Sequence, residues 1–460
     1  MQELWKWSAC KVVEGLRSGR IQIEDTLQCL EERIKAVDPI INALPTLCFD
    51  RARERAERLQ SLPMERRGLL AGLPVAIKDL TEVSGVRTTF GSRIFENFVP
   101  THSDQLVMRL ERQGGVIYAK SNTPEFGTGG ITFNDVFGIT RSPRNLDFSS
   151  GGSSGGAAAS LAAGCAWLSH GSDMAGSLRT PAAFCGVTSL RPSPGRVRSD
   201  SEYRPFAILG AEGPMARSLE DLGLFADALF ADSPESMLAA ARDPIKPHRI
   251  AFSADLGVTT IDDQVRHQFE SFIKRLHRES IIAKDTAPSL PKVHSAFDDL
   301  RAHEYAIGLE QTLADHPGTM KPEVQWNIRQ GLALSASAIR SAQRSQGQII
   351  NQAAEFMHDY DVLICPATSV LSVPAELRYP GSDQGVPYSE YYRWLGIAYT
   401  TTMTALPVIT LPVAESEDGM PFAIQLVGKP FGETSLFRYA RYIEQLTDWS
   451  SVPIDVASHS

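Results

Sequence analysis

Short apolar segments alternate with longer amphipathic segments through most of this chain, and this alternation limits its fold more than any other feature. The apolar segments span three to six residues each, as buried strands do, and the segments between them have apolar residues at helical spacing. Expected strands lie at 73–77, 115–119, 166–168, 361–364, 408–411 and 422–427. Expected helices cover about 103–113, 218–230, 262–278, 298–313 and 434–447. The pattern predicts an α/β sandwich with helices on both faces of a large sheet.

The first 62 residues differ from the rest because they contain helical patterns without strand-like segments. A helix is expected from about Glu24 to Val37, and a charged one from about Asp50 to Leu62. We therefore expect an N-terminal helical segment at 1–62 packed on the core, a single domain at 63–450 and a tail at 451–460. The segment 369–393 is rich in proline, glycine and tyrosine, which predicts an irregular surface loop.

An uninterrupted run of serines and glycines, Ser149-Ser-Gly-Gly-Ser-Ser-Gly-Gly156, stands out from the rest of the chain. Such a run is typical of a flexible linker. Here it leads directly into Ala157-Ala-Ala-Ser-Leu-Ala-Ala163, a strong helix former whose small side chains suit close packing. A linker seldom stands at the start of a buried helix. We therefore expect a loop whose glycines permit close backbone approach around Ser153.

Three polar residues are candidates for one catalytic site. Lys78 follows the expected strand at 73–77, where burial would lower the pKa of its side chain and supply a neutral amine. The alternative is a lysine that only extends its charged end to solvent. Ser153 lies in the Ser/Gly run, and Ser177 lies in a second loop at 171–181 whose backbone N–H groups would point into one cavity. Lysine is one of the bases that activate a serine hydroxyl, so the three residues fit one scheme.

Histidine, the more usual base, has no comparable candidate here. Of the ten histidines, His170 is the best placed because it precedes the second loop, although its position also fits a histidine packed at a strand end. His303-Glu304 begins a zinc-binding HExxH pattern, but Ile307 stands where the second histidine is required. The scheme based on lysine is therefore favoured.

Charge and composition narrow the range of partners. The chain of 460 residues has 45 basic and 54 acidic residues, a net charge of −9, without the basic stripe of a nucleic-acid binder. It has no stretch of about 18 apolar residues, and its charged N-terminus lacks the apolar core of a signal peptide. The six cysteines form no CxxC pair, which disfavours zinc and redox sites. We expect a cytoplasmic protein that binds neither nucleic acid nor a membrane.

Eight short motifs, in this order, resemble those of the amidase signature family. They are Gly72-Leu-Pro-Val-Ala-Ile-Lys-Asp79, Asn122-Thr-Pro-Glu-Phe-Gly127, Gly151-Gly-Ser-Ser-Gly-Gly156, Gly171-Ser-Asp-Met-Ala-Gly-Ser-Leu-Arg-Thr-Pro-Ala182, Phe184-Cys-Gly-Val187, Gly213-Pro-Met-Ala-Arg217, Ala405-Leu-Pro-Val408 and Gln425-Leu-Val-Gly428. The similarity spans about residues 5–447, and the chain resembles stand-alone bacterial amidases. It implies a large mixed central β-sheet between helices, and a hydrolase that cleaves amide C–N bonds.

The resemblance also implies roles for individual residues. Ser177 matches the nucleophile that forms an acyl-enzyme, Ser153 matches a bridging serine that follows a cis peptide bond, and Lys78 matches the general base. Four backbone amides match the oxyanion hole, those of Met174, Ala175, Gly176 and Ser177. Three further residues match supports of the two loops, namely Ser154, Asp173 and Arg179.

The chain departs from the family pattern just before the expected nucleophile. The family usually has two glycines there, whereas this chain has Ala175 and Gly176. If the first position requires a positive φ, alanine would be strained by roughly 1 kcal/mol. Met174 stands where threonine is common, which would change the shape of the pocket. Neither departure removes Lys78, Ser153 or Ser177.

The substrate pocket is expected among glycine, aromatic and apolar residues near these loops. The candidates are Phe126, Gly127, Gly129, Gly130, Ile131, Phe133, Tyr391 and Trp394. The aromatic ones would favour an apolar or aromatic substrate, although aromatic clusters more often fill a core. Anilides, indoleacetamide-like amides, carbamates and small aliphatic amides all stay open. No metal or organic cofactor is expected, because deacylation needs only water.

Two alternative functions share part of this evidence. The segment 151–155 matches the G-x-S-x-G elbow of α/β-hydrolases, which would make Ser153 the nucleophile of an esterase-type enzyme, but a polar segment precedes it where a strand is required. The glutamine-hydrolysing A subunits of tRNA amidotransferases contain the same Ser-Ser-Lys set and act within a complex. The expected partner is otherwise a small-molecule amide, and a homodimer is left open.

Overall fold

The core of the computed structural model is a large β-sheet, and the model describes residues 3–198, 200, 208–230, 234–279, 281, 283–383 and 386–458. Within these residues the sheet has 11 strands in the order β1-β3-β2-β8-β10-β9-β16-β17-β13-β11-β12. The strands are β1 (Thr46–Leu47), β2 (Pro74–Lys78), β3 (Val116–Ser121), β8 (Leu168–Asp173), β9 (Thr188–Arg191), β10 (Ala211–Ala216), β11 (Ile250–Phe252), β12 (Ala283–Asp285), β13 (Val362–Pro366), β16 (Val408–Glu415) and β17 (Pro421–Val427).

The sheet is mixed. Strand β2 runs parallel to both β3 and β8, and β11 runs parallel to both β12 and β13. The strands from β8 to β13 in the middle of the sheet, and the edge pair β1–β3, are antiparallel. The predicted large mixed central sheet is therefore confirmed.

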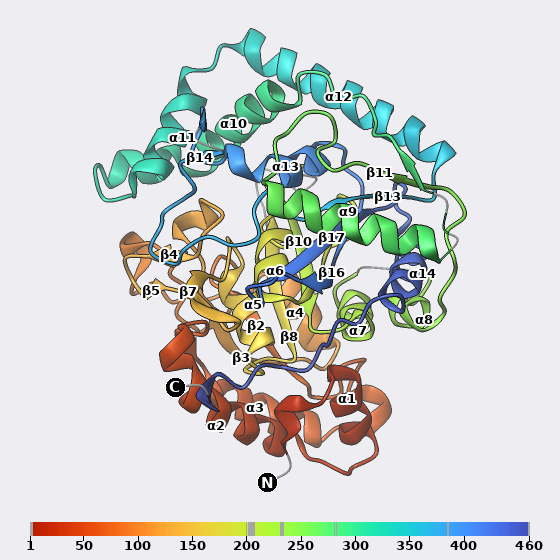
Figure 1. The fold of residues 1–460 in the computed structure, drawn as a ribbon. Coiled ribbons are helices and arrows are strands. Elements are labelled where there is room, and N and C mark those ends of the chain that lie inside the picture. Colours follow the sequence, from red (N-terminus) through yellow and green to blue (C-terminus); the bar gives the residue numbers. More distant parts are fainter. Residues whose placement is uncertain are drawn as a thin grey trace.

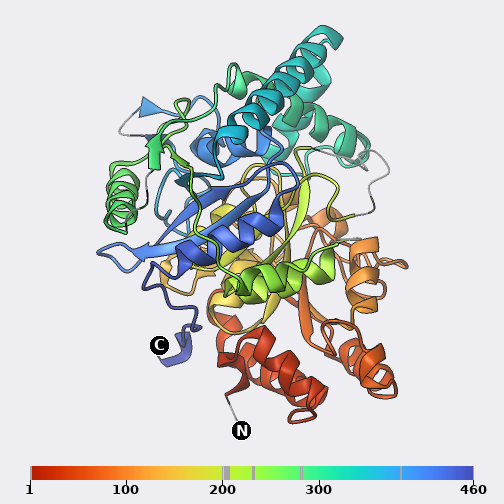
Figure 2. The same cartoon turned by 90° about the vertical axis from the view of Figure 1, so that its right-hand side faces the viewer.

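Helices cover both faces of the sheet, as Figures 1 and 2 show. The short helices α5 (Gly155–Ala162) and α6 (Arg179–Cys185) are buried along their whole length. Small side chains let α5 approach the sheet closely, which explains why this alanine-rich segment directly follows the serine and glycine run. The remaining helices near the sheet include α4 (Gln105–Arg112), α7 (Leu219–Leu229), α8 (Met237–Arg242), α9 (Asp263–Arg278) and α14 (Glu433–Glu444).

The N-terminal helices lie together at one end of the molecule, at the bottom of Figure 1. They are α1 (Ala9–Arg17), α2 (Ile23–Ile41) and α3 (Phe49–Gln60). This segment also supplies β1, the edge strand beside β3, so it shares the sheet with the rest of the chain. The side chain of Arg33 on α2 donates to Ala163 O at 2.9 Å and to Asp455 Oδ1 at 2.6 Å. The described part of the C-terminal tail therefore packs on α2.

A second group of helices lies at the opposite end, at the top of Figure 1. It consists of α10 (Val293–Asp315), α11 (Pro322–Ala333), α12 (Ala336–Asp359) and α13 (Gly396–Met403). The sequence predicted only part of α10. The segment 369–393 is less irregular than expected, since it contains the short strands β14 (Ser382–Asp383) and β15 (Val386–Pro387) and a buried Tyr392, although residues 384 and 385 lie outside the described residues.

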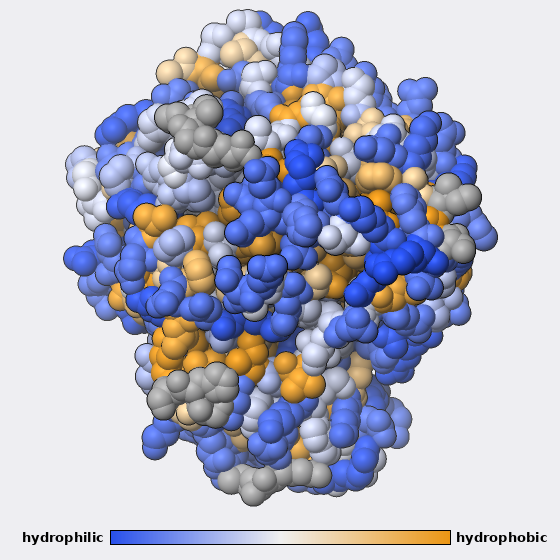
Figure 3. Space-filling view, viewed as in Figure 1, coloured by the Kyte–Doolittle hydropathy of each residue, from blue (hydrophilic) through white to orange (hydrophobic). Residues whose placement is uncertain are grey.

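Strand prediction was weakest where the strands contain polar residues. The apolar segment 166–168 was expected to be a strand, but β8 begins only at Leu168 and continues through Ser169 to Asp173. Strands β9 to β12 were not predicted. Polar side chains cover most of the face seen in Figure 3, with apolar ones in patches between them. None of the helices in the described part of the chain is long and apolar enough to span a membrane.

Candidate active site

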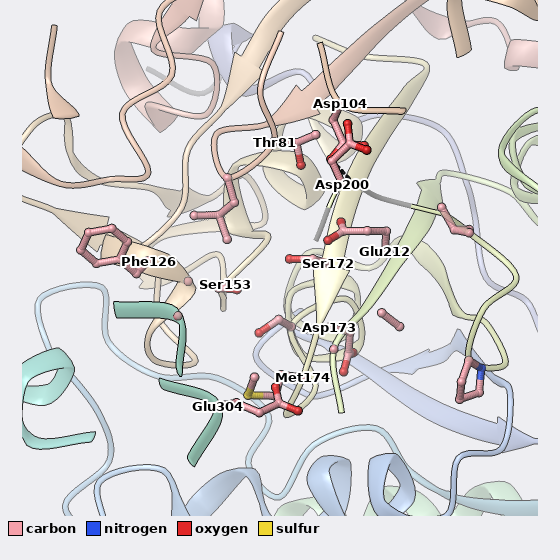
Figure 4. A pocket seen from close by; sticks show the side chains of 18 of the residues that line it. Thr81, Asp104, Phe126, Ser153, Ser172, Asp173, Met174, Asp200, Glu212 and Glu304 are labelled. Atoms are coloured by element: carbon pink, nitrogen blue, oxygen red, sulfur yellow. Dashed lines mark hydrogen bonds between the residues drawn. The ribbon is translucent and has the colours of Figure 1, made fainter. Parts of the chain in front are cut away.

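The candidate site forms where two parallel strands end side by side. Lys78 is the last residue of β2, and Ser172 and Asp173 close the neighbouring strand β8. Parallel neighbours place their carboxyl ends at the same edge of the sheet, where α/β proteins commonly bind ligands. The loop before α5 brings Ser153 to the same place. A cavity of about 410 Å³ opens there, and Figure 4 shows Ser153 and Ser172 on its wall.

Lys78 is fully buried, and three serine hydroxyls surround its amine. The Nζ atom lies 2.7 Å from Ser153 Oγ, 2.9 Å from Ser154 Oγ and 3.0 Å from Ser172 Oγ. Burial lowers the pKa of Lys78 to about 7, although the negative charges of Glu212 and Asp173 oppose this shift. Near neutral pH the side chain is therefore available as an amine base.

The orientation of the neutral amine follows from the hydrogen bonds of the neighbouring serines. Ser154 Oγ donates its own proton to Ser172 O at 3.2 Å, so it accepts a hydrogen bond from Lys78. If the second N–H of Lys78 points to Ser172 Oγ, the lone pair of the amine faces Ser153, its nearest partner. Lys78 is thus placed to take the hydroxyl proton of Ser153.

The loop after β8 is fixed by a buried ion-pair network. Arg179 donates to both carboxylate oxygens of Asp173, at 3.0 and 2.8 Å. Arg179 also donates to Ala398 O and Gln425 Oε1, both at 2.7 Å. Burial alone would raise the pKa of Asp173, but Arg179 and Arg191 outweigh burial and hold that pKa well below its usual range. The supporting positions predicted for Asp173 and Arg179 agree with these contacts.

The four backbone amides expected in an oxyanion hole do not behave alike. The N–H of Gly176 donates to Asp173 Oδ1 at 3.0 Å, so this amide is occupied by the loop itself. The N–H groups of Met174, Ala175 and Ser177 have no hydrogen-bond acceptor among the described residues. Three of the four expected N–H groups are thus without an acceptor in the described part of the chain, and the fourth is already occupied.

Ala175 fits its position, whereas Gly176 could not be replaced without movement. Ala175 is absent from the described non-glycine residues with positive φ, so the strain considered for it does not arise. Gly176 has φ +105°, and a Cβ atom there would lie 2.6 Å from Ala398 Cβ. The glycine that this chain retains is therefore the one that the loop requires.

Ser177 lines the cavity and is partly exposed. Its backbone O accepts a hydrogen bond from Ser154 N at 3.1 Å, which joins the two serine loops. In the described part of the chain Ser177 Oγ has no hydrogen-bond partner, so the hydrogen bond to Ser153 that the resemblance implies is not formed in this structure. Catalytic hydrogen bonds often become shorter only in the complex with substrate.

Ser153 follows a cis peptide bond from Gly152, as the resemblance implied. Its position does not suit the nucleophile elbow of an α/β-hydrolase. Strand β7 (Asn145–Ser149), which precedes it, belongs to a separate two-stranded sheet with β6 (Arg141–Ser142) and is not a strand of the central sheet. A nucleophile elbow requires a strand of the central sheet directly before the serine.

Only part of the predicted substrate pocket lines the cavity. Phe126 and Gly127 do, and Figure 4 shows Phe126 beside Ser153. Trp394 is buried against Phe184, with ring centroids 6.4 Å apart. The hydroxyl of Tyr391 accepts a hydrogen bond from Asn327 Nδ2 at 2.8 Å. Six predicted residues lie outside the lining of this cavity: Gly129, Gly130, Ile131, Phe133, Tyr391 and Trp394. These six help to pack the loop and the helices behind it.

Other segments, which the sequence did not indicate, supply much of the wall. One turn of α10 adds Tyr305 and Leu309, and the chain after β2 adds Leu80 and Thr81. Met174 packs with the apolar cluster beneath α10 and α11. No sequence signal marks this side of α10, because the helix meets the cavity only through the tertiary fold.

Four acidic residues on the wall also escaped prediction: Asp104, Asp200 and Glu212, which Figure 4 shows in one part of the cavity, and Glu304 on α10. Glu212 Oε2 on β10 is hydrogen-bonded to His170 Nε2 at 2.8 Å. His170 is completely buried on β8, which agrees with a histidine packed within a strand rather than one exposed to substrate.

Comparisons with known proteins agree with this geometry. The family model described as Amidase matches residues 25–437. The A subunit of a glutamyl-tRNA(Gln) amidotransferase from Carboxydothermus hydrogenoformans is 31% identical over 97% of this chain and 98% of its own length. An "Acylamidase" from Rhodococcus erythropolis is 30% identical over 98% of this chain and 97% of its own. A bacterial aryl acylamidase structure, 22% identical, has a TM-score of 0.91 over 99% of both chains. The chain therefore belongs to the Amidase family, that of the amidase signature enzymes, as its motifs predicted.

Proposed function

We propose that this chain is a stand-alone amidase that hydrolyses the C–N bond of small linear amides, with Ser177 as nucleophile. The observation behind this proposal is the buried amine of Lys78, which lies 2.7 Å from Ser153 Oγ in a cavity that Ser177 also lines. Anilides, aliphatic amides and carbamates are candidate substrates, because all three present an acyl carbon bonded to nitrogen.

Acylation would begin with two proton transfers. Ser177 Oγ attacks the acyl carbon while its proton passes to Ser153 Oγ, and the proton of Ser153 passes to Lys78 Nζ. The negative oxygen of the tetrahedral intermediate would accept hydrogen bonds from the free N–H groups of Met174, Ala175 and Ser177. Because these donors are fixed by the Asp173–Arg179 network, little reorganisation is needed.

Release of the amine would reverse the same relay. The C–N bond breaks, and the proton on Lys78 returns through Ser153 to the leaving nitrogen. Water then attacks the acyl-enzyme, with Lys78 again accepting a proton through Ser153, and Ser177 leaves the acyl group with its proton restored. The products are a carboxylic acid and an amine.

A glutamine-hydrolysing component of a tRNA amidotransferase is the second candidate, because a relative of similar sequence has that name. Glutamine has an α-carboxylate, and its site would normally offer a cation to that group. The described residues that line the cavity include aspartates and glutamates but no lysine, arginine or histidine. This charge distribution supports a substrate without a carboxylate, and thus the stand-alone amidase.

The test is a panel of substrates with the purified chain alone. The panel contains anilides, aliphatic amides, indoleacetamide, carbamates, esters and glutamine, and Ser177→Ala is the control. Turnover of neutral amides that disappears in Ser177→Ala would support the proposal. Turnover of glutamine alone would support the amidotransferase component, and hydrolysis retained by Ser177→Ala would refute the assigned nucleophile.

A further inference from the structure

Glu212 on β10 is paired with a residue that contacts the amine of Lys78, although nothing in the motifs marks it as functional. It stands directly opposite Ser172 in the antiparallel pair of β10 with β8, and Ser172 Oγ contacts Lys78 Nζ at 3.0 Å. Opposite residues of an antiparallel pair point to the same face of the sheet, with Cβ atoms about 5 Å apart. Figure 4 likewise shows the side chains of Ser172 and Glu212 side by side.

A hydrogen bond to His170 on the neighbouring strand β8 fixes the carboxylate of Glu212. His170, two residues before Ser172 on β8, is fully buried, and its Nε2 lies 2.8 Å from Glu212 Oε2. The other ring nitrogen, Nδ1, has no partner among the described residues. A proton on Nε2 and none on Nδ1 satisfies this environment, because a charged ring would bury a second N–H without an acceptor. His170 therefore orients Glu212 without cancelling its negative charge.

The other charged groups around Lys78 are compensated or more distant. Asp173 on β8 is paired with Arg179 and Arg191. On β3, Lys120 is paired with Asp79, which follows Lys78. The remaining carboxylates of the cavity are those of Asp104, Asp200 and Glu304. Of these carboxylates, Glu212 and the compensated Asp173 are the two whose charges oppose the effect of burial on the pKa of Lys78.

We propose that Glu212, oriented by His170, is a positioning residue that stabilises the protonated amine of Lys78 while Ser177 reacts. The proposal rests on the proposed function, because it assigns to Lys78 the role of proton acceptor. Each proton transfer creates a buried ammonium ion, and serine hydroxyls alone do not neutralise its charge. A fixed carboxylate on β10, which β8 separates from β2, compensates that charge without blocking the lone pair that faces Ser153.

The test uses phenylmethylsulfonyl fluoride, a reagent that labels activated serines, so the substrate need not be known. Ser177 Oγ would bond to the sulfur as fluoride leaves, and the serine proton would pass through Ser153 to Lys78. The labelling rate is measured against pH by intact mass spectrometry. Glu212→Gln keeps the shape of the side chain. For this variant we expect the acid limb, the part of the pH–rate profile where labelling slows as Lys78 becomes protonated, to move down by about one pH unit. Its rate on the alkaline plateau should also fall, because a less basic amine accepts the proton more slowly.

Two further variants separate charge from structure. His170→Leu frees the carboxylate to turn toward solvent, so its acid limb should move in the same direction, and His170→Gln, which restores an N–H donor, should reverse that shift. Asp200→Asn removes another carboxylate of the cavity and should leave the limb in place. Thermal unfolding of every variant shows that the fold is retained.

The outcomes separate this inference from the function on which it rests. An unshifted limb in Glu212→Gln, with normal labelling of the wild-type chain, overturns the role of Glu212 alone. An increase in KM for a panel substrate with no shift of the limb would assign Glu212 to substrate binding instead. Failure of the wild-type chain to react at Ser177 would overturn the proposed nucleophile, and with it this inference.

Discussion

Two lysines occupy neighbouring strands at the same edge of the sheet, and both are fully buried, yet their surroundings differ. Among the described residues, the amine of Lys78 on β2 forms hydrogen bonds only with serine hydroxyls. Lys120 on β3 lies 3.2 Å from the carboxylate of Asp79 and donates to Thr88 Oγ1 at 2.7 Å and to Thr81 O at 2.8 Å. Burial lowers the pKa of both lysines; for Lys78 only the charges of Glu212 and Asp173, with which it forms no ion pair, oppose this shift, whereas for Lys120 the directly paired Asp79 does. A buried lysine paired with a carboxylate is suited to structure, and one among hydroxyls is suited to accept a proton.

The largest expected effect comes from removing the unpaired lysine. Lys78→Met should lower kcat/KM by roughly 10³-fold or more, because the variant retains no base for the serine relay. Its thermal unfolding temperature should change little, since no buried charge loses a partner. Steady-state kinetics and calorimetry on the same preparations check both. A variant that unfolds readily but keeps its specific activity would reverse the roles given to the two lysines.

Removing the paired lysine should have the opposite effect. Lys120→Met leaves Asp79 buried without its ion pair, which should cost about 3–5 kcal/mol of unfolding free energy. Denaturant titration at 25 °C measures this loss. The double substitution Lys120→Met with Asp79→Asn should recover part of it, because no uncompensated charge remains. If both variants are as stable as the wild-type chain, the pair has no structural role.

The pH dependence should follow Lys78 and not Lys120. Lys78 accepts a proton only when neutral, so acidification through its pKa of about 7 removes the active form. Below this value kcat/KM should fall about tenfold per pH unit. Profiles between pH 5 and 9 measure the effect, with circular dichroism at each pH to exclude unfolding. A rate that stays constant across this range would contradict the assignment of Lys78 as the base.

The smallest effect concerns the third hydroxyl around Lys78. Ser172→Ala removes one hydrogen bond that orients the amine, and kcat/KM should fall roughly 2- to 10-fold. Ser169→Ala is a matched control on the same strand, because Ser169 Oγ is buried without a partner among the described residues. The control should keep its activity. Equal losses in the two variants would show that the effect arises from β8 as a whole.

The sequence indicated the polar centre of the candidate site better than its walls. Lys78, Ser153 and Ser177 were proposed because each lies in a short local pattern, either at the end of a strand or within a glycine loop, and the structure places all three at one cavity. Glu212 and Tyr305 were missed because they reach the cavity through strand pairing and helix packing, which leave no local pattern. Trp394 was assigned to the pocket from its aromatic character alone, and the structure places it in the core.

Secondary structure shows the same division. Helices with a single apolar face, such as α9, were predicted to within about a residue of their bounds. The predicted position of β8 was too early in the chain, because serine, histidine and aspartate follow Leu168. Buried polar residues are not recognised as a strand when strands are predicted from hydrophobicity. The same polar residues belong to the network around Lys78, so the polar character that hid most of β8 from prediction also builds the candidate site.

The wall supplied by α10 has a consequence for how such an enzyme diversifies. The groups assigned to bond cleavage lie between positions 78 and 177, whereas Tyr305 and Leu309 come from a helix well beyond them in the chain. Replacement of side chains on that helix would exchange one set of accepted molecules for another while the proton relay stays intact. This part of the wall can therefore vary independently of the relay, whereas Leu80, Phe126 and Met174 line the cavity from the same stretch of chain as the relay residues.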